Sequence, residues 1–288
     1  MQTVVGILTD ALAYGMVLFM ISIGLSVTMG LMKVVNLAHG AFAMIGGYLA
    51  SYFTRGLGTG YEIAIVLSVI ATVIIALPLE RLLYRRIYGT VDPLVQVLMT
   101  IGITFVVIGV TNFLFGPTLK TIPLPSYVSG PVDLGFRTLP AHRLFVVACG
   151  AATAFGLWVL IERTNFGVKL RAAVDNPAMA AALGVKTEVI YALSFALAVG
   201  LGALGGVLGA EMLPIEPFYA LKYMVLFLVV VSVGGAGSIP GALVASLILG
   251  LADTTGKYLF PEYGDFWFYL AVIGIVYLFP NGLLGRAH

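Results

Sequence analysis

Charged residues are scarce along this chain. Lysine, arginine, aspartate and glutamate make up 10% of its 288 residues, whereas soluble domains carry about 25%. Hydrophobic residues make up 60%, and the mean hydropathy is +1.07. The few charges are scattered and form no basic patch, so no nucleic-acid partner is expected. This composition predicts a chain that lies in a lipid bilayer.

Residue types that carry chemistry are equally few. The single cysteine, Cys149, cannot form an intrachain disulfide, and in its apolar run it is expected to be a small packing residue. The three histidines, His39, His142 and His288, belong to no H-E-x-x-H pattern, and the sequence contains no G-x-S-x-G. We therefore expect no enzyme activity, no metal site and no cofactor bound to this chain.

Long apolar runs are abundant instead. A helix needs ~20 mostly apolar residues to cross a bilayer, and uncharged runs near this length recur along the sequence. The predicted spans are Ala11–Met32, Val34–Thr54, Ile63–Leu79, Pro93–Leu119, Leu144–Ile161, Val189–Ala210, Tyr223–Ala252 and Phe266–Gly285. Glycines interrupt the run Tyr223–Ala252, which therefore holds either two spans or one span and a re-entrant segment. The prediction is an all-α integral membrane protein, a bundle of eight or nine transmembrane helices.

Lysine and arginine in short loops predict the orientation, because cytoplasmic loops carry an excess of both. One such loop holds Arg81, Arg85 and Arg86, and a second is Glu162–Lys186. Arg286 places the C-terminus in the cytoplasm as well. The sequence favours nine spans, which would put the N-terminus outside. The connections are too short for a soluble domain, so residues 1–288 are predicted to form a single transmembrane domain.

The stretch from residue 33 to residue 50, KVVNLAHGAFAMIGGYLA, combines polar and small residues in a region almost without charge. In a helix, side chains three and four positions apart share a face. Polar side chains in lipid normally face the protein interior or a water-filled path, and small residues let helices approach closely. We predict a helix at the centre of the bundle whose substrate-path face comprises Asn36, His39, Gly40, Ala43 and Gly47.

Two interpretations of His39 are open from the sequence. Histidine titrates near neutral pH and could carry protons. A proton-driven carrier would normally add a carboxylate within the membrane, and the central spans offer few. That shortage favours a hydrogen-bonded structural pair of His39 and Asn36.

A glycine-rich break, GGAGSIPG, interrupts one apolar run. No Lys-Ser/Thr pair follows the glycines, so the break is not a phosphate-binding loop. It either lines the pathway, where non-helical backbone beside water or protein is tolerated, or forms a tight cytoplasmic turn between two spans. The residues assigned to this break are Gly234, Gly235, Gly237, Ser238 and Gly241.

G-x-x-x-G pairs occur in two places, and those in the first place overlap. Gly202, Gly205, Gly206 and Gly209 form two of them, and Gly237 with Gly241 forms a third. Such pairs most often indicate close helix packing, and that interpretation is favoured here.

The cytoplasmic loop Glu162–Glu188 carries the signals of a helix pair. Its first helix is predicted over Phe166–Val174 and is amphipathic, with Lys169 and Arg171 facing outward. Asn176 is suited to cap a second helix, because its side chain can accept a hydrogen bond from the first turn.

This second helix has its own start and stop signals. Pro177 suits its first turn, and Gly184 suits the left-handed position that follows a helix end. Met179, Ala180 and Leu183 are predicted to form an exposed apolar patch. An alanine-rich helix pair of this kind favours docking into a groove of another protein, and the alternative is a solvated connector.

Five segments together resemble the permease subunits of branched-chain amino acid ABC transporters. They occur in the order typical of that family and extend over nearly the whole chain: VVNLAHGAFAMIGGYLA, ERLLYRR, GVKLRAAVDNPAMAAALGV, GGAGSIPGALVASLILG and FPNGLLGR. The resemblance, which is closest to the shorter H-type permeases, implies a heteromeric importer in a bacterial or archaeal cytoplasmic (inner) membrane. Its implied partners are a second, similar permease, two cytoplasmic subunits that bind and use ATP, and a periplasmic or lipid-anchored substrate-binding protein.

The resemblance also assigns a role to the cytoplasmic helix pair. The loop that contacts the ATPases in this family falls here on Gly167, Arg171, Ala172, Asp175, Asn176, Ala180, Ala181 and Gly184. The implied cargo is a branched-chain or related hydrophobic amino acid, although relatives carry urea, short amides or aromatic acids. A self-sufficient proton-coupled carrier or channel and a structural membrane scaffold are the alternatives outside this family.

Overall fold

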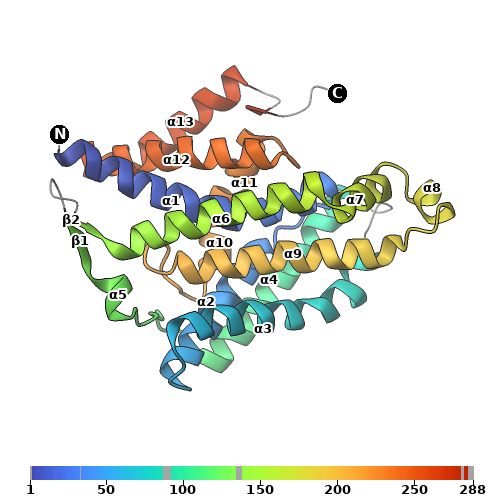
Figure 1. Ribbon diagram of the computed structural model, residues 1–288, viewed down its shortest axis with the longest axis horizontal. Coiled ribbons are helices and arrows are strands. Elements are labelled where there is room, and N and C mark those ends of the chain that lie inside the picture. Colours follow the sequence, from blue (N-terminus) through green and yellow to red (C-terminus); the bar gives the residue numbers. More distant parts are fainter. Residues whose placement is uncertain (1, 33, 87–91, 134–137, 280–281, 285–288) are drawn as a thin grey trace.

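Helices dominate the part of the chain that the structure describes (Figure 1). The computed structural model describes residues 2–32, 34–86, 92–133, 138–279 and 282–284. Its β structure in these ranges includes one antiparallel hairpin, in which β1 (Pro131–Asp133) pairs with β2 (Thr138–Pro140). The inference from Arg286 and part of the last sequence motif lie outside the described residues.

Six of the described helices are long and apolar enough to cross a bilayer. They are α1 (Gln2–Ser26), α3 (Tyr61–Leu82), α4 (Pro93–Phe115), α6 (Ala141–Arg163), α9 (Thr187–Leu208) and α12 (Ile239–Leu259). A π-helical turn, η1 (Val27–Leu31), continues α1. These helices confirm an all-α membrane protein, but they do not confirm a total of eight or nine spans.

Three further apolar helices are shorter than predicted. They are α2 (His39–Arg55) with 17 residues, α11 (Met224–Gly234) with 11 and α13 (Gly264–Leu278) with 15. At 1.5 Å per residue, such helices extend about 16 to 26 Å, less than the ~30 Å of a hydrocarbon core. The one-turn helix α10 (Tyr219–Lys222) leads into α11.

The remaining short elements lie at the ends of the long helices. They are η2 (Tyr84–Arg86), α5 (Ser126–Ser129), α7 (Asn165–Asp175), α8 (Pro177–Ala182) and η3 (Pro261–Tyr263). In Figure 1, α7 and α8 lie at one end of the long axis, and the start of α1 lies at the other.

Polar contacts tie the helices together at the end remote from α7. Asp10 of α1 forms an ion pair with Arg143 at the start of α6. The hydroxyl of Tyr258, near the end of α12, donates to Asp10 at 2.9 Å. Near α7, the backbone N–H of Leu283 donates to Val233 of α11 at 2.6 Å. The described chain therefore starts and finishes at opposite ends of the bundle.

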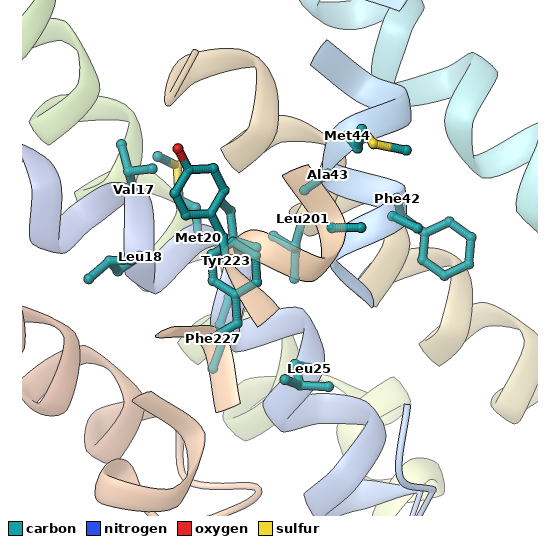
Figure 2. Packing of buried hydrophobic residues seen from close by; sticks show 14 of the residues in the cluster. Val17, Leu18, Met20, Leu25, Phe42, Ala43, Met44, Leu201, Tyr223 and Phe227 are labelled. Carbon is teal, nitrogen blue, oxygen red and sulfur yellow. The ribbon is translucent and has the colours of Figure 1, made fainter. Parts of the chain in front are cut away.

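The most enclosed helix is α2, because 13 of its 17 residues are buried. It packs against α9, α3, α1 and α10. In Figure 2, Ala43 lies near Leu201 of α9 and Tyr223, whereas the ring of Phe42 points to the other side of α2. That ring meets Phe195 of α9 edge-on, with 5.8 Å between the ring centroids. The prediction of a central helix in this part of the chain is confirmed.

Large apolar side chains are exposed on the outer helices. Phe113 of α4 is 89% exposed, Tyr277 of α13 is 85% exposed and Ile74 of α3 is 61% exposed. In water such a surface would be unfavourable, whereas lipid tails accept it. The outer helices therefore present apolar side chains suited to contact with lipid.

Candidate functional site

The helix α2 begins at His39, so the prediction of a helix that already includes Asn36 is wrong. Residues 34–36 are not helical, and residues 37 and 38 form a turn. The side-chain oxygen of Asn36 accepts a hydrogen bond from the backbone N–H of Ala38 at 3.1 Å. Such a local bond from an asparagine side chain competes with helix formation, and here the turn prevails.

Side chains from α4 satisfy the backbone of this break. The N–H of Val35 donates to Oε1 of Gln96 at 3.0 Å, and the N–H of Leu37 donates to the hydroxyl of Thr100 at 3.2 Å. Gln96 and Thr100 are one helical turn apart and both buried. Unpaired backbone groups are very unfavourable in lipid, so these two residues make the break possible.

Asn36 makes a second hydrogen bond, to the turn η2 that follows α3. The hydroxyl of Tyr84 donates to Oδ1 of Asn36 at 2.9 Å, and both residues are almost fully buried. Because Oδ1 accepts two hydrogen bonds, the orientation of the amide is determined. Asn36 therefore joins α3 to the start of α2.

His39 fills a slot between α1 and α9. Its Nε2 donates to the backbone carbonyl of Ile21 at 2.8 Å, since a carbonyl oxygen can only accept. A Cβ atom on Gly24 would lie 2.6 Å from the ring, and one on Gly202 would lie 3.0 Å from it. The side chains of His39 and Asn36 thus bond to different groups, and the predicted hydrogen-bonded pair is wrong. The structural interpretation of His39 fits this fixed position.

The small residues of α2 lie close to neighbouring elements, against backbone at two positions and against a side chain at the third. A Cβ atom on Gly40 would lie 3.3 Å from the Cα atom of Ala220, and one on Gly47 would lie 2.8 Å from the side chain of Ile215. Ala43 faces Gly206 so closely that a methyl group on Gly206 would overlap the Ala43 carbonyl. The stripe is thus a packing surface, and its place beside a substrate path stays a prediction.

The G-x-x-x-G pairs of α9 pack closely, as predicted. A Cβ atom on Gly205 would lie 2.5 Å from Ile21, and one on Gly209 would overlap Val17 of α1. Together with Gly202 against His39, these contacts show that α9 presents its glycines to both α1 and α2.

The glycine-rich break forms a tight turn between α11 and α12. Gly235 and Gly237 have φ angles of 89° and 82°, which glycine adopts far more readily than other residues. Ser238 begins α12 as its N-cap, and its hydroxyl accepts from the N–H of Gly241 at 3.0 Å. Gly241 lies directly against the Gly234 carbonyl. Of the two interpretations, this geometry matches the turn.

The end of α1 packs onto this turn. The N–H of Gly237 donates to the hydroxyl of Ser26 at 2.9 Å. A methyl group on Gly30 would overlap the backbone of Gly237. Ile239, the first residue of α12, packs on the cluster that contains Ile161 and Leu170. The turn therefore lies at the same end of the bundle as α7.

The helix pair α7–α8 confirms the predicted start and stop signals. Oδ1 of Asn176 accepts from the N–H of Met179 at 2.9 Å, and Pro177 lies in the first turn of α8. Gly184 has a φ of 84°. The N–H groups of Gly184 and Val185 donate to the Ala181 and Ala180 carbonyls at 2.9 and 3.0 Å, the pattern of a Schellman cap.

Two residues of the pair differ from the prediction. Arg171 does not simply face outward, because its Nη1 donates to the Ile161 carbonyl at 2.9 Å. The last carbonyls of a helix lack partners within it, and Arg171 satisfies one of them near the end of α6. Ala180 is only 3% exposed, so it belongs to the inner face and not to the predicted apolar patch.

The residues assigned to the coupling loop divide into inner and outer sets. Gly167 and Ala180 are buried, and a methyl group on Gly167 would overlap the Ile161 carbonyl. The outer residues are exposed: Ala172, Asp175, Asn176, Ala181 and Gly184. Met179 and Leu183 are also exposed, at 57% and 77%. The pair thus presents a small outward surface on a well-packed base.

An apolar groove of about 670 Å³ lies between α12 and α13, away from α2. Leu251, Leu259 and Trp267 are among its lining residues. Within the described part of the chain, the acidic residues, histidines and cysteine form no cluster that could hold a metal ion. The arrangement provides close helix packing and hydrogen-bond partners for buried backbone groups.

Comparison with known proteins decides the family. Residues 7–279 match the family described as the permease component of the branched-chain amino acid transport system. The chain belongs to this permease family. It is 27% identical to the high-affinity branched-chain amino acid permease LivH of Escherichia coli K12, over 93% of this chain and 91% of LivH. It is 28% identical to BraD of Pseudomonas aeruginosa, over 97% and 95% of the two chains.

Family membership confirms the resemblance carried by the motifs and makes this chain a multi-pass membrane protein of a transport-permease family. Sequence reasoning about the permease nevertheless missed Tyr84, Gln96 and Thr100, which hold the break before α2. Gln96 did carry a signal, because it is an isolated amide in an apolar run. Tyr84 carried none beyond its place in the motif ERLLYRR.

Proposed function

We propose that this permease is the transmembrane subunit of a binding-protein-dependent ABC importer for branched-chain or related hydrophobic amino acids. The family and the names of the relatives support this proposal. A zwitterionic amino acid cannot cross hydrocarbon unaided, because burying a charge there is very unfavourable. The permease therefore provides a polar path that opens alternately to the two sides.

The proposed complex contains a second, similar permease, two cytoplasmic ATP-binding subunits and a periplasmic or lipid-anchored binding protein. ATP is bound and used by the ATP-binding subunits, and this chain itself needs no cofactor. The complex resides in the cytoplasmic (inner) membrane of a bacterium or archaeon. This chain contributes one transmembrane domain over residues 1–288.

The chain crosses the membrane nine times in this proposal. Six crossings use the long apolar helices, and three use the shorter helices α2, α10–α11 and α13 together with their non-helical flanks. The start of α1 lies at the end of the bundle opposite to α7, and the end of α13 lies on the same side as α7. A chain that starts and finishes on opposite sides crosses an odd number of times, which agrees with nine. The N-terminus is then outside and α7–α8 is cytoplasmic.

The outward surface of α7–α8 is the single observation that carries the coupling role. Met179 in α8 and Leu183 at its C-cap are exposed on a helix pair that projects beyond the six long apolar helices. Outside lipid, exposed apolar side chains of this size favour contact with a partner. In the proposal, this surface docks on an ATP-binding subunit, and closure of the ATPase pair moves the permease through it.

The small-residue face of α2 is proposed to border the substrate path. Ala43 and Gly40 bring α2 against backbone of α9 and α10, and Gly47 brings it against the side chain of Ile215. Contacts made by glycine and alanine let helices pack at short range, and a small relative movement would open space along this face. Asn36 and His39 lie at its start, towards the α7 end of α2.

The coupling role is tested with reconstituted complexes that carry Ala181→Trp. The bulky ring should prevent docking in a groove fitted to a methyl group, so stimulation of ATP hydrolysis by the loaded binding protein should be lost. Ala152→Trp, at an exposed position of α6, controls for the effect of a tryptophan as such. Normal stimulation in the Ala181→Trp complex would leave α7–α8 as a connector.

The importer itself is tested with the purified chain. After detergent extraction, an ATPase pair and a second permease should copurify with it. Amino acid uptake by liposomes that contain this chain alone would instead support a self-sufficient carrier or channel. Competition of urea, short amides or aromatic acids for uptake by the whole complex would shift the substrate assignment within the family.

A further inference from the structure

A row of side chains connects α7 with the break before α2. Its first member is Tyr191 of α9, whose hydroxyl donates to the backbone carbonyl of Ala173, near the end of α7, at 2.7 Å. Tyr191 also packs on the small cluster that holds α7 in place. Any displacement of α7 is therefore transferred to the start of α9.

One turn further along α9, Phe195 contacts two other elements. Its ring centroid lies 4.7 Å from that of Tyr84 in η2 and 5.8 Å from that of Phe42 in α2. Residues four apart share a helix face, so Tyr191 and Phe195 form one rigid edge of α9. An ion pair between Arg85 and Glu188 links η2 to α9 a second time, near the surface.

Tyr84 completes the row, because its ring and its hydroxyl have different partners. The ring packs on Phe195, and the hydroxyl donates to Oδ1 of Asn36 at 2.9 Å. Tyr84 has no exposed surface. Asn36 lies in the non-helical segment whose neighbours Val35 and Leu37 are bonded to α4.

We propose that Tyr84 is a positioning residue that transmits movement of α7–α8 to the break before α2 through its hydrogen bond to Asn36. This inference rests on the proposed coupling role of α7–α8. A packed ring alone can slide over its neighbour, whereas a hydrogen bond constrains both distance and direction. Through the bond, a shift of α9 and η2 reorients Asn36, the turn at Ala38 and the start of α2.

The break is suited to respond to such a shift. Two of its backbone N–H groups donate to the side chains of Gln96 and Thr100, and the side chain of Asn36 is held by Tyr84, so no continuous helical ladder holds the segment. Discrete changes of hydrogen-bond partners, in contact with packed neighbours, are the physical basis of transmission between distant sites. A helix at the same place would resist bending, because each of its turns is bonded to the next.

The experiment removes one oxygen atom. Tyr84→Phe keeps the ring on Phe195 and deletes the donor to Asn36. In reconstituted complexes, substrate transported per ATP hydrolysed should fall about tenfold, within the 5- to 150-fold range of typical coupling between sites. Assembly and basal ATPase activity should stay close to wild type, because Oδ1 of Asn36 keeps its bond from the Ala38 N–H. A merely structural role would lower assembly and basal activity together with the ratio.

The matched control is Tyr61→Phe. Tyr61 is a buried tyrosine at the other end of α3, and its hydroxyl has no hydrogen-bond partner among the described residues. The control should transport normally. An equal loss in both variants, or a wild-type ratio of transport to ATP hydrolysis in Tyr84→Phe, would overturn the proposal.

Two further variants keep the outcome decisive. Tyr191→Phe breaks the row at α7, so it should lower the same ratio, and combining it with Tyr84→Phe should add little, because both act on one route. If Tyr84→Phe does not assemble, a normal ratio in Tyr191→Phe overturns the proposal. When Ala181→Trp abolishes stimulation while Tyr84→Phe and Tyr191→Phe behave normally, only this route is refuted. Normal stimulation in Ala181→Trp refutes the coupling role itself.

Discussion

The break before α2 and the α7–α8 pair both interrupt the run of long apolar helices, but their backbones are satisfied in different ways. The backbone N–H groups of the break donate to side chains far along the chain: Val35 donates to Gln96, and Leu37 donates to Thr100. The helix pair uses its own residues, with Asn176 capping α8 at its start and Gly184 at its end.

The difference follows from the solvent of each region. Lipid offers no hydrogen bonds, so an irregular segment inside the bundle must find protein partners or it would not persist. At the bundle's end, water can replace a lost partner, and local caps suffice. Changes that remove a partner should therefore be more severe at the break than in the helix pair.

The largest effect is expected from overfilling the packing around α2. In Gly206→Ala, the new methyl group would overlap the Ala43 carbonyl, whereas in Gly200→Ala it would make ordinary contacts at 3.5 Å or more. We expect Gly206→Ala to lower the free energy of unfolding by about 3 kcal/mol or to prevent folding. Gly200→Ala should be neutral or slightly stabilising. Thermal unfolding in detergent compares the two, and equal stability would refute the packing described here.

The next effect concerns the break itself. Gln96→Leu leaves the N–H of Val35 without its acceptor, at an expected cost of about 1 to 3 kcal/mol. The control is Thr104→Val on the same helix, because the Thr104 hydroxyl bonds only to the Thr100 carbonyl of its own helix. Its free energy of unfolding should stay within about 0.5 kcal/mol of the wild-type value. A Gln96→Leu variant as stable as this control would show that the break does not depend on α4.

A smaller effect is expected where α6 meets α7. Arg171→Gln removes the donor to the Ile161 carbonyl and should cost about 1 kcal/mol, because water reaches this region and partly replaces the bond. Lys169→Gln, at an exposed position of α7, should be neutral. The measurement is again the unfolding temperature, together with proteolysis of the loop. Equal susceptibility of both variants would contradict the role of Arg171 as a cap.

The smallest effect is expected in α8. Asn176→Ala removes the N-cap bond to Met179, for which the expected cost is about 0.5 kcal/mol in this exposed helix. Hydrogen exchange of the α8 amides should rise while that of α2 stays unchanged. If Asn176→Ala destabilised the whole bundle as much as Gln96→Leu, the contrast between the buried segment and the water-facing segment would be lost.

Local signals made the helix pair predictable. The signals are an asparagine followed by a proline, and a glycine eight positions after the asparagine. Each acts within one or two helical turns, and the structure shows the caps that they predict. The glycine pairs of α9 were predictable for the same reason, since their effect depends only on the absent side chain. The orientation of Ala180 and the inward bond of Arg171 were not predictable, because they depend on how α7–α8 rests on α6 and α9.

The sequence by itself determined that this chain is a bundle of apolar helices with glycine-lined contacts and a capped helix pair at one end, because composition, periodicity and caps act over short distances. Only the tertiary structure decided where α2 begins and what Asn36, His39 and Tyr84 do. The hydrogen bonds that tie this segment to other helices join residues 18 to 63 positions apart along the chain. Where no water is available, these distant hydrogen-bond partners determine whether a polar stretch is helical or non-helical.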